Sequence, residues 1–356
     1  MSLQASIAGA ERALDAHVRR VVGVHFGDEG TPFWRRFAAQ RGLDVRAEVQ
    51  GFADLLRIFP NFDKAWLRDA PHADWVPASR LGQPFHVFET GGTTGAPTQR
   101  PSWDDHKIDY AAFAETLSDD AFPRGGAWLI LGPTGPRRLR LAMEHLAHCR
   151  GSVAYHVDLD PRWVRRLLAE GDGVTAKRYQ DHVLGQAVTL LQHRAIAAVF
   201  TTPRLLELLG DRVDLVAAGV RGVLCGGTSM RPQTVRFLAE EVLGGAIAFV
   251  AVYGNTLMGL ARSEPVGAHN GWEVVYHAPQ PRAVLRVVGA DGALAAYGSR
   301  GQVELTTLTD ELFLPRLLER DEAIRRPPVE GMPWDGVGDV VPMGTTSGKT
   351  TIEGVY

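Results

Sequence analysis

The sequence has few cysteines, no long apolar run and little net charge, and each shortage excludes a class of protein. Its 356 residues contain two cysteines, Cys149 and Cys225, so we expect no disulfide framework and a reducing, cytoplasmic location. No apolar run is as long as a membrane span, and the first residues do not resemble a signal peptide. The formal net charge of -3 gives no general attraction to nucleic acid or to membranes.

The composition is that of an ordinary globular protein, with 45% hydrophobic and 22% charged residues. Short apolar runs predict buried strands at residues 127–131, 153–157, 197–200, 222–225 and 248–252. Helical patterns lie between them, and Asp160-Pro161 is typical of a helix start. This alternation predicts an α/β fold whose parallel sheet is covered by helices.

We expect four segments along the chain. Residues 1–80 form a helical segment in which Leu14, Val18 and Val22 share one helix face, and Trp34, Trp66 and Trp75 pack it onto the body. Residues 81–270 form the α/β core with a ligand site. Residues 271–325 form a small antiparallel β subdomain, because alternating strands are predicted at 283–288 and 302–307. Residues 326–356 begin a hinge.

The most informative stretch is Thr90-Gly91-Gly92-Thr93-Thr94-Gly95-Ala96-Pro97-Thr98, which follows the strand-like run at 84–88. Glycines let the backbone approach a ligand closely, and consecutive N–H groups with threonine hydroxyls can surround an anion. A phosphate chain is the natural ligand. The stretch lacks the lysine of a Walker A loop. The simpler alternative is a Gly/Thr turn between two elements.

Three later segments add to this stretch: Cys225-Gly226-Gly227-Thr228-Ser229-Met230, Tyr253-Gly254-Asn255-Thr256 and Leu314-Pro315-Arg316-Leu317-Leu318-Glu319-Arg320-Asp321. In this order, the four segments resemble those of the adenylate-forming superfamily, which includes acyl-CoA ligases, peptide-synthetase adenylation domains and luciferases. The resemblance runs from about Phe52 to the end of the chain.

Two further features of the sequence resemble particular groups within this superfamily. Thr98 in place of the usual lysine, together with Thr306-Thr307-Leu308-Thr309, resembles the phenylacetate-CoA ligase branch. The phrases at 253–256, 318–321 and 353–356 resemble truncated adenylating proteins of phenazine antibiotic biosynthesis.

The resemblance implies the large N-terminal domain of the adenylate-forming fold, with ATP or AMP and Mg²⁺ as cofactors. It implies that Thr94 binds the metal and acts in catalysis together with Arg100. Arg100, Arg320 and Lys349 are the alternatives for a residue that partly substitutes for the missing lysine. The implied nucleotide-binding residues are Thr90, Gly91, Gly92, Thr93, Thr94, Gly95, Gly226, Gly227, Thr228, Tyr253, Gly254, Asn255 and Thr256. Asp321 is implied as the ribose ligand, and Asp339 is a second candidate.

The implied reaction is attack by a substrate carboxylate on the α-phosphate of ATP, giving an acyl-adenylate and pyrophosphate. A small aromatic acid, such as a phenazine acid, is the implied substrate. Leu257 stands where the superfamily has a glutamate that binds Mg²⁺, so Thr94, water and phosphate, or else Glu264, would hold the metal.

The chain ends at Tyr356, where the superfamily's hinge begins, so we expect the C-terminal lid domain and its lysine to be absent. Adenylation would then be slow or depend on a partner, either a downstream reductase or a protein that supplies the lid. The oligomeric state stays open, with a homodimer among the alternatives.

Two other functions stay open. One is a complete acyl-CoA ligase or acyl-protein synthetase, and the other is a non-catalytic protein that binds nucleotide or carboxylate. The basic run Arg137-Arg138-Leu139-Arg140 is interpreted as a solvated helix face.

Overall fold

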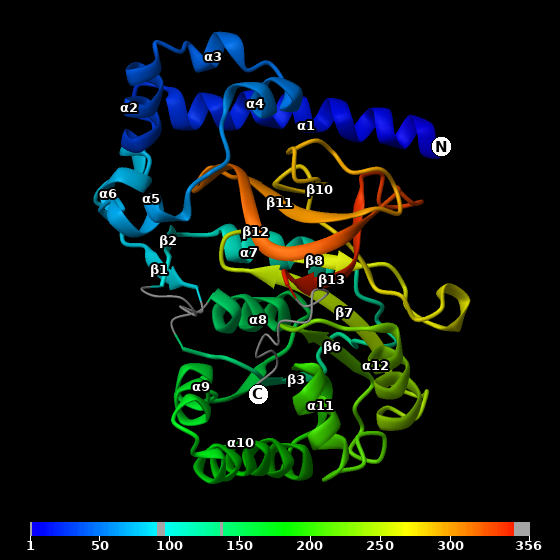
Figure 1. The fold of residues 1–356 in the computed structure, drawn as a ribbon. Helices are drawn as coiled ribbons and strands as arrows, with labels where there is room; N and C mark the ends of the chain where they lie inside the picture. The colour runs from blue at the N-terminus through cyan, green and yellow to red at the C-terminus, as the bar shows by residue number, and fades with distance from the viewer. Residues whose placement is uncertain (1, 91–96, 136–137, 345–356) are drawn as a thin grey trace. The chain divides into compact units, whose positions relative to one another are not determined.

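The structure is a computed structural model that describes residues 2–90, 97–135 and 138–344. The chain forms two compact units that alternate along the sequence. Unit 1 contains Met1–Asp105, Asn255–Gly259 and His277–Met343, and unit 2 contains His106–Gly254, Leu260–Tyr276 and Gly344–Tyr356. Figure 1 shows this alternation, because the blue N-terminal helices and the orange C-terminal strands belong to unit 1 and the green elements to unit 2.

Unit 1 begins with one long helix, which is followed by several short helices. The helices are α1 (Leu3–Phe26), α2 (Pro32–Arg41), α3 (Val45–Glu48), α4 (Phe52–Ile58), α5 (Lys64–Asp69), α6 (His72–Trp75) and the turn η1 (Ala78–Arg80). The predicted face of α1 is confirmed, since Leu14, Val18 and Val22 are all buried. The predicted packing of the tryptophans is confirmed for Trp34 and Trp75, which are buried. The Trp34 ring lies edge-on to Phe313, with centroids 5.1 Å apart, and its Nε1 donates to the Phe313 carbonyl over 3.0 Å.

The strands of unit 1 are antiparallel. They are β10 (Ala283–Val288), β11 (Arg300–Leu308), β12 (Phe313–Arg326) and β13 (Gly336–Pro342), which pair in that order, and the separate pair β1 (His86–Glu89) and β2 (Gln99–Ser102). The antiparallel β region is therefore confirmed. Strand β12 has 14 residues, and charged side chains along it hide the strand pattern in the sequence.

Unit 2 holds the parallel sheet. Its elements are α7 (Asp105–Ala114, whose first residue belongs to unit 1), β3 (Ala127–Leu131), α8 (Arg138–Cys149), β4 (Ala154–Val157), α9 (Pro161–Ala169), α10 (Gly173–His193), β5 (Ile196–Thr201), α11 (Pro203–Gly210), β6 (Gly222–Gly226), α12 (Pro232–Phe237), η2 (Leu238–Val242), β7 (Ala248–Asn255), β8 (Gly259–Ser263), η3 (Ala268–Asn270) and β9 (Val275–His277). Strands β4, β3, β5, β6 and β7 are neighbours in that order and run parallel. The predicted α/β fold is therefore confirmed.

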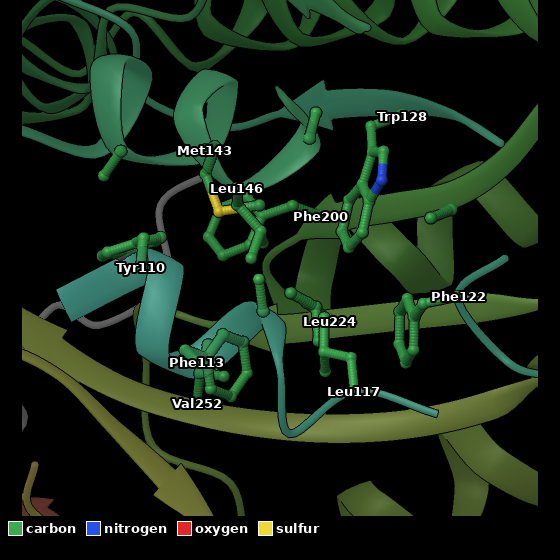
Figure 2. Packing of buried hydrophobic residues seen from close by; sticks show 14 of the residues in the cluster. Tyr110, Phe113, Leu117, Phe122, Trp128, Met143, Leu146, Phe200, Leu224 and Val252 are labelled. Carbon is green, nitrogen blue, oxygen red and sulfur yellow. The ribbon is translucent and has the colours of Figure 1, made fainter. Parts of the chain in front are cut away.

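The core of unit 2 lies between this sheet and two helices. Tyr110 and Phe113 of α7 and Met143 of α8 pack on side chains such as Trp128 and Phe200 of the sheet (Figure 2). The predicted helix start at Asp160 is also confirmed, because its carboxylate accepts the N–H groups of Arg162 and Trp163. Among the described residues, no helix is both long and apolar enough to cross a membrane.

A buried histidine joins α1 to the antiparallel sheet in unit 1. His25 Nε2 lies 2.7 Å from the Thr309 carbonyl, and Nδ1 lies 2.6 Å from the Thr31 hydroxyl. These partners fit a neutral ring that donates through Nε2 and accepts at Nδ1. Burial lowers the pKa of His25 to about 4 from the usual 6.5.

We predict that unit 1 loses stability as the pH falls from about 6.5 to about 4, because the unfolded chain takes up a proton at His25 before the folded chain does. The lost stability from this residue approaches ~3 kcal/mol. Urea unfolding at several pH values measures it. His25→Gln should flatten the slope over this window, whereas the exposed His148→Gln should leave it unchanged; an unaltered slope in His25→Gln contradicts the prediction.

Candidate nucleotide site

The first and last residues of the Gly/Thr stretch, Thr90 and Thr98, flank the antiparallel strands β1 and β2. The hairpin closes at Thr90 and Thr98: the Thr90 N–H donates to the Thr98 carbonyl over 2.9 Å, and the Thr98 N–H donates to Thr90 Oγ1 over 3.0 Å. The Thr90 side chain therefore fixes the neck of the loop. Gly91, Gly92, Thr93, Thr94 and Gly95 lie outside the described residues, so their predicted contacts with phosphate and metal stay predictions.

The neck of this hairpin is bound to the Tyr253-Gly254-Asn255-Thr256 segment, although the two are far apart in sequence. Thr256 Oγ1 donates to the Glu89 carbonyl over 3.2 Å. Arg100 Nη1, on β2, donates to the carbonyls of Thr256 and Leu257, both over 2.9 Å. The structure therefore brings two of the predicted nucleotide segments together within unit 1.

The Asn255 side chain shapes the turn that carries Thr256. Its Oδ1 accepts the N–H groups of Leu257 and Met258, each over 2.9 Å, and its amide donates to Glu319 over 3.0 Å. Glu319 in turn pairs with Lys64 over 2.7 Å. Since the side chain is engaged in this way, a contact of Asn255 with nucleotide would come from its backbone, and it stays a prediction.

Within unit 2, the two segments predicted to hold adenine lie at the carboxyl ends of neighbouring parallel strands. Gly226 of β6 is opposite Val252 of β7, and a Cβ at Gly226 would lie 2.6 Å from the Val252 carbonyl oxygen. Gly227 has φ +94°, which a side chain would strain. Tyr253 follows Val252 directly and is half-buried, with its ring centroid 5.5 Å from that of Tyr276. The sheet edge next to Thr228 and Gly254 is therefore built from residues that let a flat group approach the backbone.

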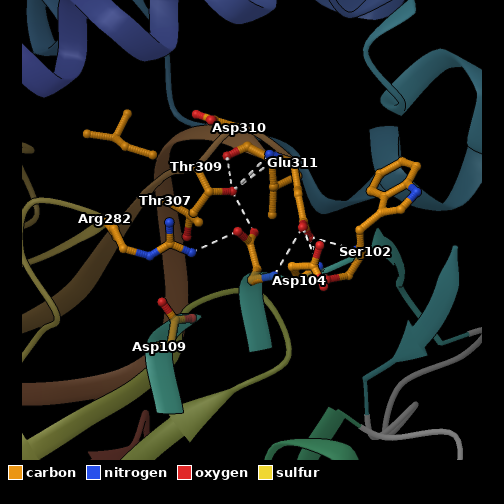
Figure 3. Close-up of polar contacts among 12 residues, drawn as sticks. Ser102, Asp104, Asp109, Arg282, Thr307, Thr309, Asp310 and Glu311 are labelled. Atoms are coloured by element: carbon orange, nitrogen blue, oxygen red, sulfur yellow. Dashed lines mark hydrogen bonds and ion pairs between the residues drawn. The ribbon is translucent and has the colours of Figure 1, made fainter. Parts of the chain in front are cut away.

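Arg100 is buried at the base of the hairpin, with 1% of its surface exposed. Its Nη2 pairs with the Asp105 carboxylate, and its Nη1 is taken by the two carbonyls at 256 and 257. Asp105 also accepts Arg282 Nη2 over 2.7 Å and Thr309 Oγ1 over 2.6 Å (Figure 3). With these contacts, Arg100 is a structural residue that fixes the base of the β1–β2 hairpin to residues 256 and 257 and to Asp105. The catalytic role of Arg100 stays a prediction. It is not supported by the structure, because both terminal nitrogens already donate to groups of the protein.

A second buried carboxylate, Glu311, was not predicted to be important. Its oxygens accept Ser102 Oγ over 2.7 Å and the backbone N–H groups of Trp103, Asp104 and Asp105 over 2.9, 2.5 and 3.0 Å (Figure 3). Two of these three consecutive N–H groups belong to the buried residues Trp103 and Asp105, where a backbone donor needs a partner. Glu311 thus fixes the chain between β2 and Asp105, and nothing in the local sequence distinguishes it from a surface acid.

The two ribose candidates lie on paired strands of unit 1. Asp321, on β12, is opposite Pro342 of β13 and is half-buried. Asp339, on β13, pairs with Arg300 and has φ +45°. Both assignments stay predictions. Arg316 of the same motif is structural, because its Nη1 donates to the carbonyls of Leu56 and Phe59 and its Nε to Glu304.

Leu257, which the sequence places where a metal-binding glutamate was expected, is buried, with 2% exposed. Its carbonyl accepts Thr307 Oγ1 over 3.0 Å as well as Arg100. No group of three or more His, Cys, Asp or Glu side chains within the described ranges could hold a metal ion. The predicted metal site at Thr94 lies outside those ranges.

We predict that Glu311→Gln destabilises the protein by about 3 kcal/mol, because an amide keeps one acceptor and turns an N–H₂ group toward backbone donors in a buried place. Chemical unfolding measures this change. Glu170→Gln is the matched control, since Glu170 forms only an exposed pair with Arg166 and should cost less than about 0.5 kcal/mol. Equal effects in the two variants would show that the buried contacts of Glu311 carry little energy.

Comparison with known proteins supports the fold. No protein-family model matches the chain, and no curated protein matches it. A solved structure of 2-hydroxyisobutyryl-CoA ligase in its postadenylation state, in complex with R3-HIB-AMP, superimposes with a TM-score of 0.69 at 16% identity, covering 98% of this chain and 70% of that chain.

The same enzyme in two other states is also similar. Its open conformation with 2-HIB-AMP and CoA gives a TM-score of 0.65 at 17% identity, over 98% of this chain and 77% of that one. Its thioesterification state gives a TM-score of 0.64 at 16% identity, and the match covers 94% of this chain and 68% of that one. The chain therefore shares the fold of these solved ligase structures, with parallel strands in unit 2 and antiparallel strands in unit 1.

Proposed function

We propose that this protein activates a carboxylic acid with ATP, forming an acyl-adenylate and releasing pyrophosphate. The observation that carries the proposal is the hydrogen-bonded junction between the neck of the Gly/Thr hairpin and the Tyr253–Thr256 segment. This junction joins the two segments that would hold the phosphates and the adenine, on a fold that it shares with a ligase solved with acyl-AMP compounds.

The chemistry asks little of the protein beyond alignment and charge neutralisation. The carboxylate must meet the α-phosphate in line with the leaving pyrophosphate, and N–H groups and Mg²⁺ must take up the negative charge. Thr94 and neighbouring hydroxyls are our candidates to hold the metal together with water and phosphate oxygens. The buried, apolar Leu257 supplies no ligand.

The finer proposal concerns the substrate and the pathway. We propose a small aromatic acid, with a phenazine acid as the first candidate, on the strength of the segments at 253–256 and 318–321. The adenylate would be consumed by a reductase or, with a partner that supplies a lid, passed to a thiol. We place the reaction in the cytoplasm.

A non-catalytic binding protein is the second candidate, and one observation favours it. The position of the superfamily's metal ligand is Leu257, whose side chain is buried and whose carbonyl is bound by Arg100 and Thr307. A chain built this way could keep nucleotide affinity without efficient pyrophosphate release.

The proposed activity predicts ATP–pyrophosphate exchange in the presence of magnesium and one class of acid. We would assay a panel of aromatic and aliphatic carboxylic acids and expect exchange with aromatic members. Nucleotide binding without exchange for any acid would favour the non-catalytic candidate, and formation of a CoA thioester would favour a complete ligase.

Tyr253→Ala is expected to raise the KM for ATP about tenfold, because base stacking on an aromatic ring contributes roughly 1–3 kcal/mol. Tyr253→Phe keeps the ring and should retain the wild-type KM. If Tyr253→Ala also leaves the KM unchanged, Tyr253 does not contact the base. The steady-state dependence of exchange on ATP concentration provides both values.

A further inference from the structure

Several polar side-chain atoms of unit 2 are buried without hydrogen-bond partners in the part of the chain that the structure describes. Among the described residues these include Nε and Nη1 of Arg138, both ring nitrogens of His156, and the hydroxyl of Thr201. Buried polar atoms in native proteins nearly always have partners, so each exception needs an explanation. A ligand that supplies the missing partners is one such explanation.

The three residues lie at the carboxyl ends of three neighbouring strands. Thr201 is the last residue of β5, His156 is next to last in β4, and Arg138 begins α8 after the loop that follows β3. Strand β3 pairs with both β4 and β5 in parallel. In open α/β sheets ligands bind beyond the carboxyl ends of the strands. His156 is in register with Ile130 and shares the face on which α8 packs, whereas Thr201 follows Phe200 and points to the other face. A ligand at the start of α8 could therefore meet Arg138 and His156, but not Thr201.

Arg138 is the unusual member of this group, since only 4% of its surface is exposed. The prediction that its basic run forms a solvated face was therefore wrong for this residue. Its Nη2 pairs with the buried carboxylate of Asp109 on α7. The remaining nitrogens, Nε and Nη1, have no partner in the described part of the chain. A guanidinium stays charged at any physiological pH, so its unused donors favour an anion.

Two other buried arginines, Arg100 and Arg150, show how the protein usually satisfies the hydrogen-bond donors of a buried guanidinium group. Arg100 donates from both terminal nitrogens, to two carbonyls and Asp105. Arg150 donates to the carbonyls of Ala114, Leu117 and Phe122 and to Asp119. In both cases the terminal nitrogens are satisfied inside the protein. Arg150 Nε also lacks a partner among the described residues, so the donor that sets Arg138 apart is its terminal nitrogen Nη1.

We propose that Arg138 is the anchor for an oxyanion of the reactants, either the carboxylate of the acid or a phosphate oxygen of ATP, bound at the carboxyl ends of β3 and β4. Asp109 positions the guanidinium through Nη2 and leaves Nη1 and Nε to donate to the ligand. Charge-assisted hydrogen bonds of this kind are short and strong. The identity of the two reactants rests on the proposed function, whereas anion binding by Arg138 does not.

The test is isothermal titration calorimetry on the whole chain, with three probes: magnesium ATP, pyrophosphate and benzoate. Arg138→Met should weaken at least one probe about tenfold or more, equivalent to ~1.4 kcal/mol. Arg140→Met, two residues along α8 and exposed, is the matched control and should bind like wild type. Asp109→Asn keeps an oxygen that can accept from Arg138 Nη2 and removes a competing negative charge, so this variant should bind at least as well as wild type.

The pattern of losses identifies the anion. Weaker ATP and pyrophosphate binding assigns Arg138 to a phosphate, and weaker benzoate binding assigns it to the carboxylate; either result supports the proposal. If Arg138→Met does not fold, Arg138→Lys and the double variant Arg138→Met with Asp109→Leu take its place, since removing both charges of a buried pair is often tolerated. Wild-type affinity for every probe in these variants, or no binding of any probe by the wild type, overturns the proposal.

The outcomes also separate this inference from the proposed function. Anion binding that depends on Arg138, without ATP–pyrophosphate exchange, would support the anchor and reject the reaction. Exchange with an unchanged KM for both ATP and acid in Arg138→Met would keep the reaction and reject the anchor.

Discussion

The buried guanidinium of Arg100 is the interaction on which the rest of unit 1 depends. It joins the β1–β2 hairpin, the turn at Thr256 and Leu257, and the carboxylate of Asp105. A charge this deeply buried is stable only when its donors are satisfied, so these three segments must keep their relative positions. Thr90 and Thr98, the described ends of the Gly/Thr stretch, therefore adjoin a hairpin base that is fixed in place.

Further buried acids extend this network. Asp105 takes two more donors from Arg282 and Thr309, and Glu311 takes Ser102 and three backbone N–H groups. Each carboxylate meets several donors, which offsets the cost of removing its charge from water. Unit 2, taken by itself, is marked by a tight backbone approach between Gly226 and Val252 rather than by buried charge at that place.

Much of the fold could be predicted from the sequence, because its signals are local. Strand β3 was predicted with its observed bounds, and Asp160 caps α9 as expected. The role of Glu311 could not be predicted, because its donors lie about 200 residues away in the chain. Arg138 was interpreted wrongly for the same reason: a basic run indicates a solvated face unless a distant acid such as Asp109 buries it. The candidate motifs could be found from their spacing in the sequence. The side-chain pairs could not, and it is these pairs that distinguish a structural residue such as Arg100 from a residue that binds a ligand.

The central proposal is that three segments of the sequence bind the nucleotide: the Gly/Thr stretch, Gly226–Thr228 and Tyr253–Thr256. Hydrogen–deuterium exchange with and without magnesium ATP tests it most directly. The account predicts slower exchange in peptides covering residues 86–102, 222–230 and 252–258, with distant helices such as α1 unchanged. Binding of ATP that leaves these three peptides unprotected, or protects other segments instead, would contradict it.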